Sequence, residues 1–406
     1  MSAQSFIIAA KRTPFGAFGG KLRDLTANEL GGIAARAAIA SLPTSLQTHL
    51  TTSTSPQQSV IFGNVLQSST DAPYLARHVG HRAGLPVTTP AYTVNRLCTS
   101  GFQSIICAAQ EIKSGDSEIV VTGGSESMSQ APYVLRNIRW GTKFGPEYMK
   151  MEDSLMSALS DRYPDVVPMA ITAERLAEKY SVTREECDNF ALQSQQRWAQ
   201  ANEAGVFGSE IAPVQVKVKK GTESMVADEH PRPQTTIEGL ARLQPVFKKD
   251  GVVTAGNASG ISDGASAVIV ASEAAVKQHD IKPLARIVSY HVVGVEPGIM
   301  GIGPVEAIRG AVEKAGLSLA QIDLIEINEA FAAQVLSCAK ALDLDPSKLN
   351  TSGGAIALGH PLGASGSRIM GHLVHRLHAT GGRYAVGSAC AGGGQGVAIV
   401  IERFSE

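Results

Sequence analysis

The chain has 406 residues, 44% of them hydrophobic and 18% charged, with a formal net charge of −1. Its length predicts two or three packed units, and its composition is typical of a globular rather than a disordered protein. The near-neutral charge gives no field that would draw the chain to nucleic acid or an anionic membrane, and no apolar run approaches the length of a membrane span. Five cysteines without a C-x-x-C pair argue against a disulfide framework and a zinc ribbon and favour a reducing compartment.

The first elements predict strands that alternate with helices. Residues 5–10 (SFIIAA) form a strand-like run, and no cleavage site of a secretory signal follows it. The first 23 residues carry four basic residues and no acid, which fits either an uncleaved mitochondrial targeting segment or a basic surface turn. A capping box of Thr26 and Glu29 opens a predicted helix, and a strand follows at 59–66. This rhythm is typical of α/β layering.

Cys98 lies where a β-prone run at 91–95 gives way to a helical pattern that ends at Gly115. A thiol just before a helix N-terminus meets backbone N–H groups and the positive end of the helix dipole, which lower its pKa toward neutrality. This placement favours a nucleophile. A buried packing residue is the commoner fate of a free cysteine, and the local sequence leaves that alternative open.

Residues 124–250 differ in character from the segments on either side, because they carry more charge and more proline. A long polar helix is predicted from 183 to 205, capped by Thr183 and Glu186. We interpret this region as an inserted loop domain, after which the α/β rhythm resumes.

Two pairs of segments echo each other across the chain. Residues 60–69 resemble 324–333, and 118–127 resemble 384–396. Two similar halves would fit these echoes, but the identity is too low to establish a duplication.

Three further stretches place a chemically useful side chain at a strand end or among glycines. Asn328 ends a strand, His360 stands in a glycine-dense loop before a helix, and Cys390 stands in a glycine-rich turn. Ligand sites in α/β sheets lie at such places, and glycine allows close approach of the backbone. A thiolate nucleophile needs an imidazole, a carbanion leaving group needs a second acid, and an oxyanion needs fixed donors. Cys98, His360, Cys390 and Asn328 would supply one group for each task, so we predict an acyl-transfer site.

Each of these side chains also has a structural interpretation. His360 could cap a loop, Cys390 could pack in the sheet, and Asn328 could satisfy a turn. Zinc bound by Cys98, His360 and Cys390 would lack the short ligand spacing of zinc sites. Three cysteines on helical stripes are interpreted as packing residues, and three histidines late on the last helix as a solvated basic end: Cys107, Cys187, Cys338, His372, His375 and His378.

Six motifs follow one another along the chain: VNRLCTSGFQSI, GGSESMSQAPY, VTAGNASGISDGASA, INEAF, GGAIALGHPLGASG and GSACAGGGQG. With this set the chain resembles the thiolase family over nearly its whole length, in particular the 3-ketoacyl-CoA type of animal mitochondria. The resemblance implies the thiolase fold, an α/β fold of two similar βαβαβαββ halves in a five-layered αβαβα arrangement. The N-terminal half would span 1–275, with the loop domain inserted at about 124–250, and the C-terminal half 276–406.

The resemblance also implies roles for the site residues. Cys98 would attack the 3-keto carbon and carry the acyl group, and His360 would activate it and help to hold the thioester oxygen. Asn328 would fix a water that completes that oxyanion hole. Cys390 would protonate the departing enolate and then deprotonate the incoming CoA thiol. The backbone N–H groups of Cys98 and Gly392 would form a second oxyanion hole.

The implied activity is thiolytic cleavage of 3-ketoacyl-CoA by CoA to acetyl-CoA and a shortened acyl-CoA, a reversible Claisen exchange of fatty-acid β-oxidation. CoA would be a co-substrate that contacts Arg232, Thr235 and Ser259, and no metal or permanently bound cofactor is expected. The family forms homodimers and homotetramers. The mitochondrial matrix is the expected compartment, with cytosol and peroxisome as alternatives.

Two features bear on substrate choice within the family. Short-chain acetoacetyl-CoA thiolases have a His-Met pair before the Thr-Ala-Glu start of a loop-domain helix, whereas this chain has Pro168 and Met169. The exchange predicts medium-chain substrates. Thr99, where the animal enzymes usually have glycine, adjoins the nucleophile and could narrow the acyl pocket. A short-chain acetoacetyl-CoA thiolase and a non-catalytic CoA- or lipid-binding relative remain the alternatives.

Overall fold

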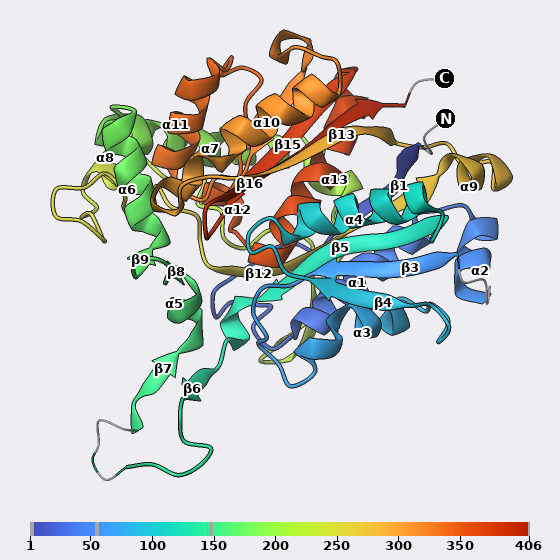
Figure 1. Ribbon diagram of the computed structural model, residues 1–406, viewed down its shortest axis with the longest axis horizontal. Coiled ribbons are helices and arrows are strands. Elements are labelled where there is room, and N and C mark those ends of the chain that lie inside the picture. Colours follow the sequence, from blue (N-terminus) through green and yellow to red (C-terminus); the bar gives the residue numbers. More distant parts are fainter. Residues whose placement is uncertain (1–3, 53–56, 144, 146–148, 405–406) are drawn as a thin grey trace.

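The computed structural model describes residues 4–52, 57–143, 145 and 149–404. One ten-stranded sheet runs through these residues, with nine strands in the order β14-β15-β16-β13-β1-β12-β5-β3-β4 and the short β2 paired to β12 (Figure 1). Its N-terminal strands are β1 Ser5–Arg12, β2 Gly16–Ala17, β3 Gln58–Gly63, β4 Ala91–Val94, β5 Ile119–Ser127 and β12 Ser262–Ser272. Its C-terminal strands are β13 Ala285–Gly294, β14 Leu324–Ile327, β15 Tyr384–Ala391 and β16 Gln395–Arg403.

The two halves of the sheet repeat one topology. In the first half β3 and β5 are parallel and β12 is antiparallel to β5, and in the second half β14, β15 and β16 repeat these relations. Leu349 makes a parallel bridge to Ile325 of β14, at the place where β4 pairs with β3 in the first half. The segments that echo each other in sequence therefore lie on equivalent strands. An antiparallel pairing of β1 with β13 joins the halves edge to edge.

Helices cover both faces of each half-sheet. The first half contains α1 Ala27–Ala40, α2 Thr44–Thr52, α3 Leu75–Arg82, α4 Ser100–Ser114 and α9 Glu273–Gln278. The second half contains α10 Gly303–Lys314, α11 Ala332–Leu342, α12 Ala355–Leu358 and α13 Leu362–Thr380. The capping box of Thr26 and Glu29 at the start of α1 is as predicted.

Three apolar cores alternate with the half-sheets. Val60 and Phe62 of β3 face α1 and α3, whereas Ile61 between them faces α4, because successive side chains of a strand point to opposite faces. Helices α4 and α13 pack against each other in the middle core, which contains strand residues of both halves. Helices α10 and α11 cover the outer face of the second half-sheet (Figure 1). This succession is the five-layered αβαβα arrangement expected from the sequence.

The segment between β5 and β12 is not part of the αβαβα layers. Its helices are α5 Ser154–Ala158, α6 Met169–Lys179, α7 Arg184–Glu203 and α8 Ile237–Ala241. Its strands form three small hairpins, namely β6 Tyr133–Leu135 with β7 Met151–Asp153, β8 Ser160–Asp161 with β9 Val167–Pro168, and β10 Val214–Val218 with β11 Gly221–Met225. Helix α7 begins with the predicted capping box of Thr183 and Glu186. The arm that carries β6, β7 and α5 projects from the body (Figure 1).

A buried ionic cluster corrects the interpretation of the late histidines. His372 is only 4% exposed and its Nδ1 lies 2.8 Å from Glu210, whose other oxygen pairs with the buried Arg12. His375 is half-buried against the carbonyl of Ala10, and only His378 is exposed. The expected solvated helix end is wrong for His372 and His375, because this part of α13 lies in the middle layer, and it is correct for the exposed His378. No helix in the described part of the chain is both long and apolar enough to cross a bilayer.

Candidate active site

A strained turn presents Cys98 at the start of α4. Leu97 has φ 50°, a left-handed conformation that costs a branched side chain free energy. The turn is held because Ser100 donates to the Leu97 carbonyl at 2.6 Å and accepts from the Arg96 N–H at 2.9 Å. Cys98 therefore lies where the sequence predicts it, directly before the N-terminus of a helix. Thr99 is fully buried, donates to the Arg96 carbonyl and does not line the cavity described below, so the expected narrowing is wrong.

His360 precedes α13, the counterpart of α4 in the second half. The two helices pack against each other, which brings Cys98 and His360 to one place although they are far apart in sequence. The His360 N–H donates to the Gly260 carbonyl at 2.9 Å. Its ring nitrogens face two buried partners, Nδ1 at 2.6 Å from Ser365 Oγ and Nε2 at 3.4 Å from Asn328 Nδ2. The ring is thus fixed from both ends.

The electrostatics of the site keep its groups neutral at rest. Burial lowers the pKa of His360 to about 3, and the nearby Arg368 adds to this effect. Burial also raises the pKa of Cys98 to about 11, although the backbone N–H groups of Gly392 and Cys98 act in the opposite direction. The pKa of Cys390 is raised well above its ordinary value by burial and by its proximity to Cys98 and Cys338. The expected thiolate at the helix N-terminus is therefore wrong for the resting site, because burial outweighs the nearby donors.

Asn328 and Cys390 come from neighbouring strands of the second half. Asn328 follows β14, and its N–H donates to the carbonyl of Ser388 in β15 at 2.9 Å. Cys390 lies near the end of β15 and is 1% exposed. The turn to β16 passes through Gly393 and Gly394, both with positive φ, so it requires glycine. Two adjacent parallel strands thus deliver the amide and the second thiol to the same edge of the sheet.

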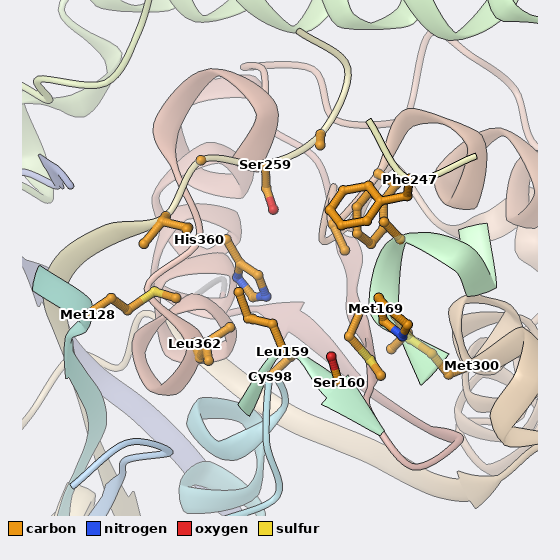
Figure 2. Close-up of a pocket in the computed structure, with 18 of the residues that line it drawn as sticks. Cys98, Met128, Leu159, Ser160, Met169, Phe247, Ser259, Met300, His360 and Leu362 are labelled. Carbon is orange, nitrogen blue, oxygen red and sulfur yellow. The ribbon is translucent and has the colours of Figure 1, made fainter. Parts of the chain in front are cut away.

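Cys98, His360 and Cys390 line a cavity of about 270 Å³ (Figure 2), whereas the buried Asn328 is not among its lining residues. His360 points into it from one side, with Met169 and Met300 on the other. Apart from Cys98, His360, Cys390, Ser160 and Ser259, its walls are apolar, formed by Met128, Met156, Leu159, Pro168, Met169, Ala170, Phe247, Ala258, Gly260, Ile261, Met300, Ala330, Phe331 and Leu362. Such a wall suits a flexible hydrocarbon chain, since methionine side chains repack easily.

The three residues expected to contact CoA do not all lie on this cavity. Ser259 lines it, whereas Arg232 and Thr235 form a surface turn in which the Thr235 hydroxyl donates to the Arg232 carbonyl at 2.7 Å. His230 links the two places, because a Cβ at Gly260 would lie 1.8 Å from its Nε2. The exposed Arg232 guanidinium is therefore close in the chain to a residue packed against the cavity loop.

Sequence reasoning missed Glu126, which supports the site from behind. Its carboxylate accepts from the N–H groups of Val65, Leu66 and Gly363 and from the side chain of Asn64, at 2.8–3.1 Å. Burial raises the pKa of this carboxyl to about 7 although the N–H groups oppose the shift. The contact to Gly363 fixes the first turn of α13 relative to the first half. Its only sequence signal was its place at the end of a buried strand.

The fold and the site define an α/β protein in which a partly exposed thiol, a buried thiol and a neutral imidazole line one apolar cavity, and these are the groups that thiol-dependent acyl transfer requires. The thiolase N-terminal domain family matches residues 5–274 and the thiolase C-terminal domain family matches 281–403. The chain belongs to the thiolase family.

Named relatives agree along the whole chain. It is 62% identical over 397 residues to the mitochondrial 3-ketoacyl-CoA thiolase of Bos taurus and to that of Homo sapiens, which covers 98% of this chain and 98% of each relative. A crystal structure of the human mitochondrial enzyme superposes with a TM-score of 0.95 at 60% identity and covers 99% of each chain. The human enzyme in complex with CoA gives a TM-score of 0.93 at 60% identity, over 99% of this chain and 98% of that one.

Proposed function

We propose that this protein is a 3-ketoacyl-CoA thiolase of mitochondrial fatty-acid β-oxidation. It cleaves 3-ketoacyl-CoA with CoA and releases acetyl-CoA and an acyl-CoA shortened by two carbons. The observation that carries the proposal is the meeting of Cys98, His360 and Cys390 on one apolar cavity, with the buried Asn328 behind them in contact with His360. The names of its relatives support both the reaction and the compartment.

The first half-reaction begins with the neutral His360 imidazole and the neutral Cys98 thiol. His360 Nε2 takes the proton of the Cys98 thiol, and the thiolate attacks C3 of the substrate. The C2–C3 bond then breaks, its electron pair forms the enolate of acetyl-CoA, and the Cys390 thiol gives its proton to C2. Cys98 is left as an acyl thioester, His360 as an imidazolium and Cys390 as a thiolate. The depressed pKa of His360 keeps a lone pair available for the first step.

The second half-reaction restores these groups. The Cys390 thiolate takes the proton of CoA, whose sulfur attacks the thioester carbon. The Cys98 thiolate leaves and regains its proton from His360, so no net proton is consumed. The N–H groups of Cys98 and Gly392 hold one developing oxyanion, and His360 with a water on Asn328 holds the other. The effect of the Gly392 N–H on the pKa of the Cys98 thiol supports the first assignment.

CoA is a co-substrate and not a resident cofactor in this proposal. Arg232 suits a phosphate of CoA bidentately, while Thr235 shapes its turn and Ser259 meets the pantetheine arm at the cavity. All three residues lie in the first proposed half, 1–275, which carries the loop domain at about 124–250; the second half is 276–406. Exposed apolar side chains on the projecting arm support a homodimer or homotetramer: Tyr133, Trp140, Met151 and Tyr163.

A steady-state assay tests the proposal. Mixing the protein with CoA and a medium-chain 3-ketoacyl-CoA should remove the enolate absorbance of the substrate, and the loss should require CoA. The presence of both thiols and the imidazole on the cavity argues against a relative that only binds CoA or lipid. The proposal would be rejected if the absorbance stayed constant with substrates of every chain length while CoA still bound. The protein would then be a relative that binds CoA or lipid without turnover.

A further inference from the structure

We propose that Ser365 is a positioning residue that fixes His360 in the tautomer with its proton on Nδ1, so that Nε2 is the base. The inference rests on the proposed function, in which His360 accepts the Cys98 proton. Ser365 lies on the first turns of α13, and its Oγ is 2.6 Å from His360 Nδ1. Both side chains are buried, with 1% and 5% exposure. Water therefore does not compete for this contact.

Counting hydrogens assigns the tautomer. The Ser365 hydroxyl has one hydrogen, which it donates to the Pro361 carbonyl at 3.1 Å, so its oxygen is left to accept from Nδ1–H. At the other end of the ring, the Asn328 Nδ2 group carries only hydrogens and faces Nε2 at 3.4 Å. With the amide in this orientation, Nε2 presents its lone pair. Both contacts select the same tautomer, and it is the one that a base facing the cavity needs.

The tautomer matters because the ring is neutral before reaction. The alternative tautomer would point an N–H at the cavity and could not accept the thiol proton. Once Nε2 takes a proton, Nδ1–H still donates to Ser365, so the same contact also stabilises the imidazolium. Ser365 thus acts through His360 and touches no substrate.

Ser367 provides a matched control on the same helix. It is fully buried and donates to the Ala364 carbonyl three residues back at 3.0 Å, a local contact similar to the one that Ser365 makes with Pro361 four residues back. Its second contact, at 3.4 Å, is the Ser266 carbonyl in the sheet rather than the His360 ring. Removal of the Ser367 hydroxyl therefore reproduces the loss of a buried helix hydroxyl without altering His360.

The test measures the rate at which iodoacetamide alkylates Cys98, read by peptide mass, as a function of pH. S365A should lower the rate at pH 7 about tenfold, because the free energy lost with one buried hydrogen-bond acceptor corresponds to about a tenfold change in rate. The deficit should shrink above pH 10, where hydroxide replaces the imidazole as base. S367A should stay within twofold of the unmodified protein at every pH.

Two outcomes would overturn the proposal. One is an S365A deficit that is equal at pH 7 and pH 10, or equal to that of S367A, because either would indicate a general packing effect. The other is an S365A rate within twofold of the unmodified protein. Thiolysis is measured separately, with kcat expected to fall and KM to stay within twofold. An unmodified protein without thiolysis would reject the proposed function, while the alkylation profile would still decide the role of Ser365.

Discussion

Gly392 and Cys98 belong to opposite halves of the chain, yet the backbone N–H of Gly392 is close enough to the Cys98 thiol to oppose the rise in the pKa of that thiol. A Cβ at Gly392 would lie 3.3 Å from Leu97 and 3.4 Å from the Met169 sulfur, so the turn after β15 is packed directly against the nucleophile loop and the start of α6. Because the Gly392 N–H lies near the Cys98 sulfur at rest, it also lies near the substrate carbon that this sulfur attacks. The reactive environment of Cys98 therefore exists only when both halves are assembled.

The acyl group should be carried by Cys98. Brief exposure of the protein to acyl-CoA should give a mass increase equal to one acyl group, and peptide mapping should place it on Cys98. Cys98→Ala should abolish the adduct, because Cys98 is the partly exposed thiol on the cavity and Cys390, the other thiol there, is buried. Cys107→Ala is the control, since Cys107 is also partly exposed but lies on the body of α4. An adduct that persists in Cys98→Ala would contradict the assignment.

Cys390 should transfer protons only to and from C2 of the acetyl group and the CoA thiol. Cys390→Ala should still accept an acyl group on Cys98 but should exchange the α-protons of acetyl-CoA with deuterated solvent at least a hundredfold more slowly, since general acid–base groups contribute about 10²–10⁴-fold. Cys338→Ala removes another buried thiol, one that donates to the Gly301 carbonyl, and should retain the exchange. Proton NMR of acetyl-CoA measures the rate. Exchange at the unmodified rate in Cys390→Ala would show that a different group is the acid.

Much of this site could be predicted from the sequence, and the remainder could not for physical reasons. The caps of Thr26 and Thr183 are local, so they were predicted correctly. The protonation state of Cys98 depends on how deeply the thiol is buried, which a helix pattern does not report, and that expectation failed. Glu126 acts through a contact set by the packing of α13 against the first half, and the contact of Ser365 to His360 depends on the path of the loop before α13, so no local periodicity marks either residue.

The buried His360 should make stability depend on pH. Its pKa is about 3 in the folded protein against about 6.5 in an unfolded chain, so only the unfolded state takes up the proton between these values. Stability from this group is complete above pH 6.5 and is lost as the pH falls. At pH 5.5 the loss is about 1.4 kcal/mol. His360→Gln should therefore show a shallower decline of unfolding free energy between pH 7 and pH 5 than the unmodified protein. Parallel declines in urea titrations would contradict this.

Chain-length preference should follow from the wall that Pro168 and Met169 contribute to the cavity. Both residues line it together with Met156, Leu159 and Phe247, so the acyl tail meets apolar side chains where short-chain relatives carry a histidine. Each buried methylene is worth about 0.8 kcal/mol, so a few extra carbons should raise kcat/KM more than tenfold.

We therefore expect thiolysis of medium-chain 3-ketoacyl-CoA to exceed that of acetoacetyl-CoA, and Thr99 does not oppose this because it does not line the cavity. A kcat/KM series from four to sixteen carbons measures the preference. Pro168→His should move the maximum toward four carbons, because it returns a polar, bulky group to the wall. Ser160→Ala, on the same cavity but without added bulk, should leave the maximum in place. A maximum at four carbons in the unmodified protein, with steep decline beyond, would mean that the Pro168 and Met169 wall does not set the preference.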